Sequence, residues 1–251
     1  MNNSKILNAV DSARKKFDIE DFPGNLFLRF EEDKYLINNN LILFKEDIDR
    51  LSGFIGYGEN GLAAICINYK RSIGHQNFTL AHELGHWIMH KGKNISDGDI
   101  DTWNKRDKVE LEANEFAKEL LYPEKNILED FNKAKEEELF LTDNREQLAN
   151  YVNILSHQYT TSFELVLRCL LYKNHQIKEL HKVKKEIEKA LGCNISSAFD
   201  KDFYVPNEDR PEYQRYTKPY IRLRDSVNKL VEEKKIGRAT GESINLRNGE
   251  L

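Results

Sequence analysis

The order of strand-like and helix-like segments is the feature that most constrains the fold of this chain. Short apolar runs typical of strands occur only in the first 69 residues, at 26–30, 35–37, 41–44, 53–57 and 62–69. A helical pattern at 4–17 precedes them, and helical patterns follow them. A small sheet followed by helices is the order of an α+β fold, which we therefore predict.

Turn and capping residues define the predicted elements. Asn60-Gly61, between the last two apolar runs, indicates a β-hairpin. Glycine and proline then mark helix ends, with Gly92 after a helix at 78–90 and Pro123 after a helix at 108–122. We expect irregular segments at 94–107 and 192–218, and further helices at 144–156, 162–173, 176–190 and 219–234.

The composition excludes several classes of protein. The 251 residues allow one large domain or a domain with an appendage, and 38 basic against 42 acidic side chains argue against nucleic-acid binding by bulk electrostatics. No apolar run approaches the length of about 18 residues that a membrane span needs, and no signal peptide is evident. The three cysteines form no C-x-x-C pair, so neither disulfides nor a cysteine zinc site is predicted. We expect a cytoplasmic protein.

The helical segment at 78–90 carries the motif H-E-x-x-H. In an α-helix, residues i and i+4 lie about 40° apart around the axis and about 6 Å apart along it, so His82 and His86 share one face. Two imidazoles in this arrangement can bind one Zn²⁺, and the adjacent Glu83 can act as general base toward a water molecule there. The alternative is an amphipathic helix with incidental histidines, which predicts no third ligand nearby.

A candidate third ligand lies on the helix predicted at 108–122. Apolar residues recur there with a period of about 3.6, so this helix is expected to pack against the H-E-x-x-H helix at 78–90. Glu110 and Asn114 are four residues apart and share a face. Glu110 would complete a His₂Glu site, and Asn114 would hydrogen-bond one of the ligand histidines.

Other assignments for the acidic residues of this helix stay open at this point. Glu110 also fits the last position of a capping box that begins at Asp107, in which it would only bind a helix-start amide. Glu112 is the main rival as third ligand. Glu112 and Glu115 are also typical of solvated acids on an exposed helix face.

Two further interpretations of the H-E-x-x-H helix at 78–90 are excluded. His90 lies about 12 Å along the helix axis from His82, which is too far for both to bind one metal ion. The metzincin pattern requires glycine and histidine at positions where this chain has Met89 and Gly92.

The two helical segments together resemble the ImmA/IrrE family of small metallopeptidases. The sequences that carry the resemblance are FTLAHELGHWIMH at 78–90 and ELEANEFAKELLYP at 110–123. The similarity continues into the predicted hairpin upstream and, more weakly, into residues 124–176. The family is also similar to gluzincins, in which the residue four after the ligand glutamate steadies a ligand histidine. In this chain that residue is Asn114.

The resemblance implies that His82, His86 and Glu110 bind zinc and that Glu83 is the general acid and base. It implies a zinc-dependent endopeptidase with a small sheet packed on a zincin-type H-E-x-x-H helix and a ligand helix. The implied substrate is a protein partner, a helix-turn-helix transcriptional repressor of the Xre type, whose cleavage derepresses stress-response or mobile-element genes. The alternative is a zinc-stabilised binding protein without catalysis, such as a toxin–antitoxin or anti-repressor component that sequesters its partner.

We predict three parts along the chain. Residues 1–123 form the metallopeptidase domain, residues 124–176 a helix-turn-helix-like unit, and residues 177–251 a helical C-terminal extension. The second helix of the unit, at 162–173, has too few polar residues to read DNA, which favours a packing unit. The helix at 176–190 carries one narrow apolar stripe and is expected to dock by that seam, with a short coiled-coil contact as the alternative.

Overall fold

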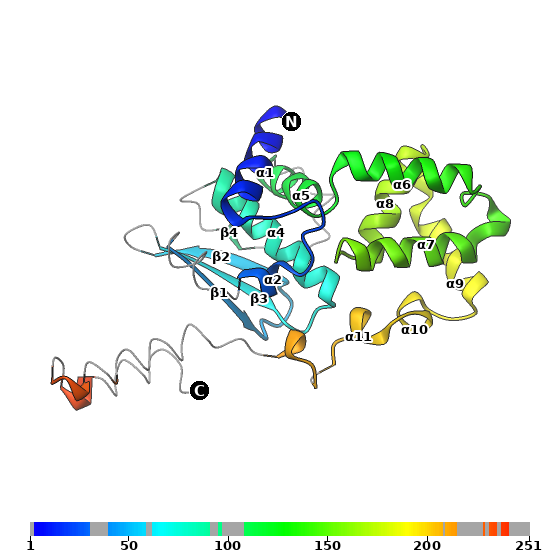
Figure 1. The fold of residues 1–251 in the computed structure, drawn as a ribbon. Helices are drawn as coiled ribbons and strands as arrows, with labels where there is room; N and C mark the ends of the chain where they lie inside the picture. The colour runs from blue at the N-terminus through cyan, green and yellow to red at the C-terminus, as the bar shows by residue number, and fades with distance from the viewer. Residues whose placement is uncertain are drawn as a thin grey trace.

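A computed structural model of the chain describes residues 3–30, 40–58, 62–90, 95–96, 108–207 and 209–214, and short pieces at 228, 231–234 and 237–240. A mixed sheet covered by helices forms the N-terminal part, and a group of helices follows it (Figure 1). This is the α+β order that the sequence predicts. Among the described residues, no helix has the length and apolar composition needed to span a membrane.

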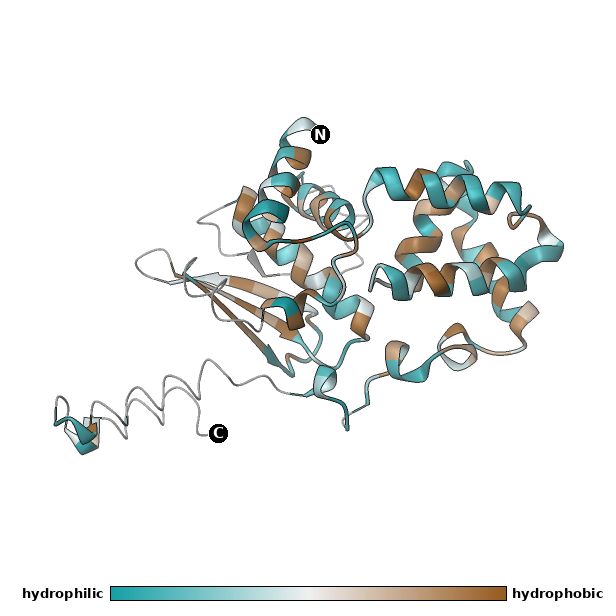
Figure 2. Cartoon of the chain, in the orientation of Figure 1, coloured by the Kyte–Doolittle hydropathy of each residue, from teal (hydrophilic) through white to brown (hydrophobic). Residues whose placement is uncertain are grey.

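Within the part of the chain that the structure describes, the sheet contains three strands from the N-terminal part and one short strand from farther along the chain: β1 (Leu41–Glu46), β2 (Gly53–Tyr57), β3 (Ala63–Asn68) and β4 (Ile95–Ser96). Their order is β1-β3-β2-β4. Strand β3 pairs parallel with β1 and antiparallel with β2, and β2 also pairs antiparallel with β4. The three longer strands confirm three of the predicted runs, and they are mostly hydrophobic (Figure 2).

Some predicted features lie outside the described residues. These are the strand at 35–37, the hairpin turn at 59–61, Gly92 and most of the helix at 219–234. The antiparallel pairing of β2 with β3 agrees with the predicted hairpin. Strand β4 lies in the segment predicted to be irregular, 94–107.

Helix α4 (Ile73–Met89) is the central element of the N-terminal part. One side of it packs on β2 and β3, and other sides contact α1 (Asn3–Phe17), α2 (Leu26–Phe30) and α5 (Lys108–Leu121) (Figure 1). Every residue from Phe78 to Trp87 is buried, as expected for a helix enclosed on all sides.

Residues 26–30 form helix α2, and the prediction of a strand there is wrong. The amide of Leu26 donates to Oδ1 of Asn77 at 2.8 Å, and the amide of Phe27 donates to Oδ1 of Asn25 at 3.0 Å. These two bonds satisfy amides that the first turn of a helix leaves without intrahelical partners. The buried positions are 26, 27 and 30, which is a helical spacing, whereas a strand would bury alternate residues.

Among the described residues after Pro123, the chain forms four longer helices and several short ones. The longer helices are α6 (Glu124–Glu136), α7 (Arg145–Gln158), α8 (Phe163–Lys173) and α9 (Leu180–Leu191). The short ones are η3 (Thr142–Asn144), η4 (Ile177–Glu179), α10 (Ile195–Ala198), α11 (Lys201–Tyr204) and η5 (Pro211–Tyr213). Helices α7, α8 and α9 confirm predicted helices. Helix α6 was not predicted; its buried residues are Asn126, Ile127 and Ala134.

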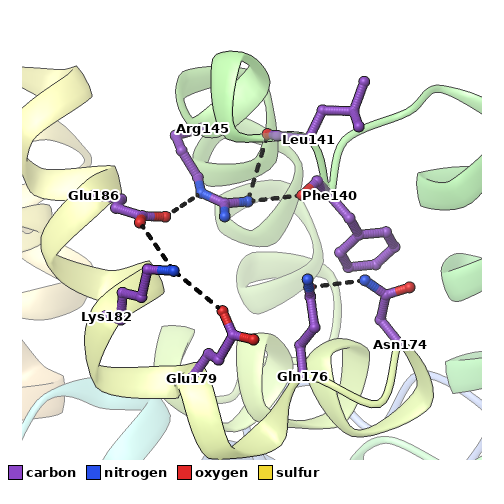
Figure 3. Close-up of polar contacts among 8 residues, drawn as sticks. All are labelled: Phe140, Leu141, Arg145, Asn174, Gln176, Glu179, Lys182 and Glu186. Atoms are coloured by element: carbon purple, nitrogen blue, oxygen red, sulfur yellow. Dashed lines mark hydrogen bonds and ion pairs between the residues drawn. The ribbon is translucent and has the colours of Figure 1, made fainter.

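A buried arginine joins α7 to α9 (Figure 3). Nε of Arg145 lies 2.9 Å from Oε2 of Glu186, and the Arg145 guanidinium also donates to the carbonyl of Phe140 at 3.0 Å. Lys182 lies between Glu179 and Glu186 on the outer side of the same contact. The prediction that this helix docks by one narrow apolar stripe is confirmed. The buried residues of the stripe are Leu180, Val183 and Ile187.

The N-terminal and helical parts share one hydrophobic core that runs from Ile6 to Ile187. At their junction, Nδ2 of Asn77 on α4 donates to the carbonyl of Thr160, in the turn between α7 and α8, at 2.8 Å. Gly74, on the first turn of α4, packs against the backbone of the same turn. The helical part is therefore fixed directly to the helix that carries the H-E-x-x-H motif.

Candidate metal centre

Three buried side chains from two helices meet between α4 and α5. His82 and His86 project from α4, and their Nε2 atoms lie 2.9 Å apart. Glu110, in the first turn of α5, places Oε2 at 3.3 Å from Nε2 of His82 and Oε1 at 3.5 Å from Nε2 of His86. These ligand atoms all lie within 4.8 Å of one another, so the three residues could hold one metal ion.

The spacing of these atoms fits a small tetrahedral ion. With metal–nitrogen distances of about 2.0–2.1 Å, donor atoms at tetrahedral angles lie about 3.3–3.4 Å apart. The 2.9 Å between the two Nε2 atoms and the 3.3 Å between Nε2 of His82 and Oε2 of Glu110 are close to this value, and the 3.5 Å contact with His86 is made by the other carboxylate oxygen. Two imidazoles and one carboxylate are also donors that Zn²⁺ accepts.

Close packing of α5 on α4 brings Glu110 to the histidines. A Cβ atom at Gly85 would lie 3.0 Å from Cδ1 of Phe116, so glycine allows the two helices to approach at this point. Burial alone would raise the pKa of the Glu110 carboxyl. The nearby imidazoles of His82 and His86, when protonated, nevertheless hold this pKa well below its usual range. The carboxyl is therefore ionised, as a metal ligand must be.

A second residue of α5 orients His82. Oδ1 of Asn114 lies 2.9 Å from Nδ1 of His82, and Asn114 is fully buried. An amide oxygen only accepts hydrogen bonds, so Nδ1 of His82 carries the proton and Nε2 keeps the lone pair that faces Glu110. This is the hydrogen bond that the spacing of Glu110 and Asn114 predicts.

Comparison with known proteins shows the family of the chain. The family model Peptidase_M78, the IrrE N-terminal-like domain, matches residues 45–187, which is more than half of the chain. The chain belongs to this metallopeptidase family. The protein named "Metallopeptidase ImmA" of Bacillus subtilis (strain 168) is 27% identical to it over 125 residues, which cover 50% of this chain and 69% of the relative. The resemblance inferred from the two helical motifs is thereby confirmed.

In this IrrE-like metallopeptidase, Glu112 lies away from the three-residue cluster. Its side chain is buried, and Oε2 lies 3.2 Å from Nε2 of His90. The prediction that Glu112 is a solvated acid is wrong, because His90, at the end of α4, supplies a partner across the helix interface. Glu115 forms an ion pair with Lys118 on the same helix.

The capping-box alternative concerns Asp107 and Glu110. Asp107 lies outside the described residues. Both carboxylate oxygens of Glu110 are close to the histidines, and Glu110 is 8% exposed. The position of this carboxylate favours the metal centre over the capping of α5.

Glu83 follows His82 on α4 and is 1% exposed. It is not part of the three-residue cluster. The pKa of Tyr57 on β2 is raised, mainly by burial and to a smaller extent by the charge of Glu83. Burial and the charges of Glu46 and Glu83 raise the pKa of Cys66 on β3 to about 12. The charge of Glu83 therefore affects the pKa of groups on both β2 and β3.

Sequence reasoning missed the part that His90 takes in this site. Nδ1 of His90 lies 3.2 Å from Nδ1 of His86. His90 is outside the metal cluster, in agreement with the helical-rise argument that excludes it as a ligand. The available signal was the spacing of four residues from His86, which places the two rings on one face of the helix.

Proposed function

We propose that this chain is a zinc-dependent endopeptidase that cleaves a specific protein partner. His82, His86 and Glu110 would bind the zinc ion, and Glu83 would transfer protons during peptide cleavage. The main support is the set of three buried residues, two histidines and one glutamate, whose ligand atoms lie within 4.8 Å of one another and are of types that zinc accepts. Membership of a metallopeptidase family supports the same reaction class.

Each residue of the site has a separate role in the proposed reaction. Zinc bound at this site would polarise the scissile carbonyl and make a water molecule more acidic. Glu83 accepts the proton of the attacking water and donates it to the leaving amine, a role that suits a carboxylate next to a ligand histidine. Asn114 holds His82 in the tautomer that binds metal.

The substrate class follows from the resemblance to the ImmA/IrrE family. We propose an Xre-type helix-turn-helix repressor, whose cleavage would release stress-response or mobile-element genes. We also propose that α7, α8 and the turn between them form a helix-turn-helix-like packing unit rather than a DNA reader. The support is burial: seven of the eleven residues of α8 are buried, which leaves few side chains for base edges.

The substitution Glu83→Gln tests the catalytic role. The amide is nearly isosteric with the carboxylate but cannot accept the proton, so the variant is expected to keep its fold and its zinc and to lose about 10²–10⁴-fold in cleavage rate. The assay is co-expression with a candidate Xre-type helix-turn-helix repressor, followed by mass spectrometry of the fragments and elemental analysis for zinc. Glu115→Gln, a carboxylate paired with Lys118 away from the site, is the matched control.

The outcomes separate cleavage from sequestration. Fragments with wild type and Glu115→Gln, and an intact repressor trapped by Glu83→Gln, would support the endopeptidase. Relief of repression by wild type and Glu83→Gln alike, with no fragments from either, would show that the protein sequesters its partner and that the proposed catalysis is wrong.

A further inference from the structure

A chain of three side chains extends from the metal centre to the far end of α4. Nδ1 of His86 lies 3.2 Å from Nδ1 of His90, and Nε2 of His90 lies 3.2 Å from Oε2 of Glu112. The side chains of His90 and Glu112 are 6% and 8% exposed, so both contacts are shielded from water. Lys108 completes the group, with Nζ 3.7 Å from the other oxygen of Glu112.

With Glu112 ionised and His90 neutral, the hydrogen-bond donors and acceptors of His86, His90 and Glu112 allow one arrangement of protons. The ionised carboxylate of Glu112 only accepts, so Nε2 of neutral His90 carries the proton. Nδ1 of His90 then has a free lone pair and accepts from Nδ1 of His86. A proton on Nδ1 of His86 leaves its Nε2 with the lone pair that faces His82 and Glu110.

We propose that His90 and Glu112 are positioning residues of the metal centre. They hold His86 in the tautomer and ring orientation that bind the metal ion. Helix α5 thus supports both ligand histidines, His82 directly through Asn114 and His86 through His90. This inference rests on the proposed zinc site, and it assigns a role to a histidine that is too far from His82 to be a ligand with it.

Metal affinity measured in four variants tests the proposal. Loss of a supporting residue behind a ligand histidine typically lowers metal affinity by about 10–100-fold, and we expect this for His90→Ala and a loss in the same direction for Glu112→Gln. His90→Asn is expected to recover most of the affinity, since its Oδ1 can accept from Nδ1 of His86. Glu115→Gln is the matched control on α5 and should bind as wild type.

The measurements are chelator competition for zinc, the visible spectrum of the cobalt-substituted protein, and thermal unfolding of the metal-free protein. The proposal predicts lower affinity and a changed cobalt spectrum for His90→Ala, with rescue by His90→Asn. Should His90→Ala fail to fold, reduced zinc affinity of Glu112→Gln relative to Glu115→Gln supports the same role.

Three results would overturn the inference. The first is zinc affinity of His90→Ala and Glu112→Gln equal to that of wild type. The second is a lower melting temperature of metal-free His90→Ala with unchanged metal affinity, which indicates a packing role only. The third is a zinc affinity of His90→Asn as low as that of His90→Ala. Absence of zinc binding by the wild-type chain would instead refute the proposed function itself, and this inference with it.

Discussion

The substitution Gly74→Ala tests how the helical part is held on α4. A Cβ atom at this position would lie 2.4 Å from the carbonyl carbon of Thr161, 2.5 Å from its oxygen and 2.7 Å from the amide nitrogen of Ser162. These are backbone atoms of the turn between α7 and α8, so no side-chain rotation relieves the overlap. Ordinary contact begins at 3.4 Å, so the turn and the helix must separate by about 1 Å.

We expect Gly74→Ala to lower stability, whereas helix propensity alone would raise it. In an isolated helix, alanine would be more stable than glycine by about 1 kcal/mol. Here the overlap costs about 1–3 kcal/mol, as other overpacked interiors do. A displacement of this size would also break the 2.8 Å bond from Asn77 to the carbonyl of Thr160, which contributes about 1 kcal/mol. We expect the free energy of unfolding to fall by about 2 kcal/mol in total.

The assay is urea unfolding of the metal-free protein, with wild type and Gly56→Ala as references. A Cβ atom at Gly56 would meet no atom within 4 Å, so this control should change stability by no more than about 0.5 kcal/mol. If Gly74→Ala unfolds at the same or a higher urea concentration than wild type, with an unchanged denaturant slope, the contact between α4 and the turn does not constrain the fold, and the reasoning fails.

Two further predictions concern zinc affinity and the pH dependence of stability. Glu110→Ala should lower zinc affinity by more than Glu112→Ala, that is, by more than about 100-fold, because it removes a ligand rather than a supporting residue; the reverse ranking in chelator competition would contradict the proposed ligand set. Burial raises the pKa of Asp130 despite hydrogen bonds from Tyr122 and Tyr159, so its ionisation at neutral pH costs stability. Asp130→Asn should be at least as stable as wild type at pH 7, and unfolding curves should converge as the pH falls through the raised pKa; a variant less stable at pH 7 would refute this.

Local patterns were sufficient for much of the fold and for half of the site. The placing of His82 and His86 on one face follows from the geometry of a single helix, and so does the sharing of a face by Glu110 and Asn114. The strands at 41–46, 53–57 and 63–68 also follow from short apolar runs beside turn residues. These features depend on neighbours within a few residues along the chain.

The conformation of residues 26–30 depended on the tertiary structure. Their apolar run suits a strand as well as a helix. The backbone amide of Leu26 donates a hydrogen bond to Asn77, 51 residues away, and this bond caps the helix that forms; such a partner cannot be read from local sequence.

The choice between Glu110 and Glu112 was likewise decided by packing. Both lie near the start of α5, and which one faces the histidines depends on the rotation of α5 against α4, set by contacts such as that of Phe116 with Gly85. The same rotation brings Glu112 to His90. Sequence by itself determined which residues share a helix face, because that is local geometry. Only the tertiary structure decided which faces meet, because close packing between helices selects one rotation from many that the local pattern allows.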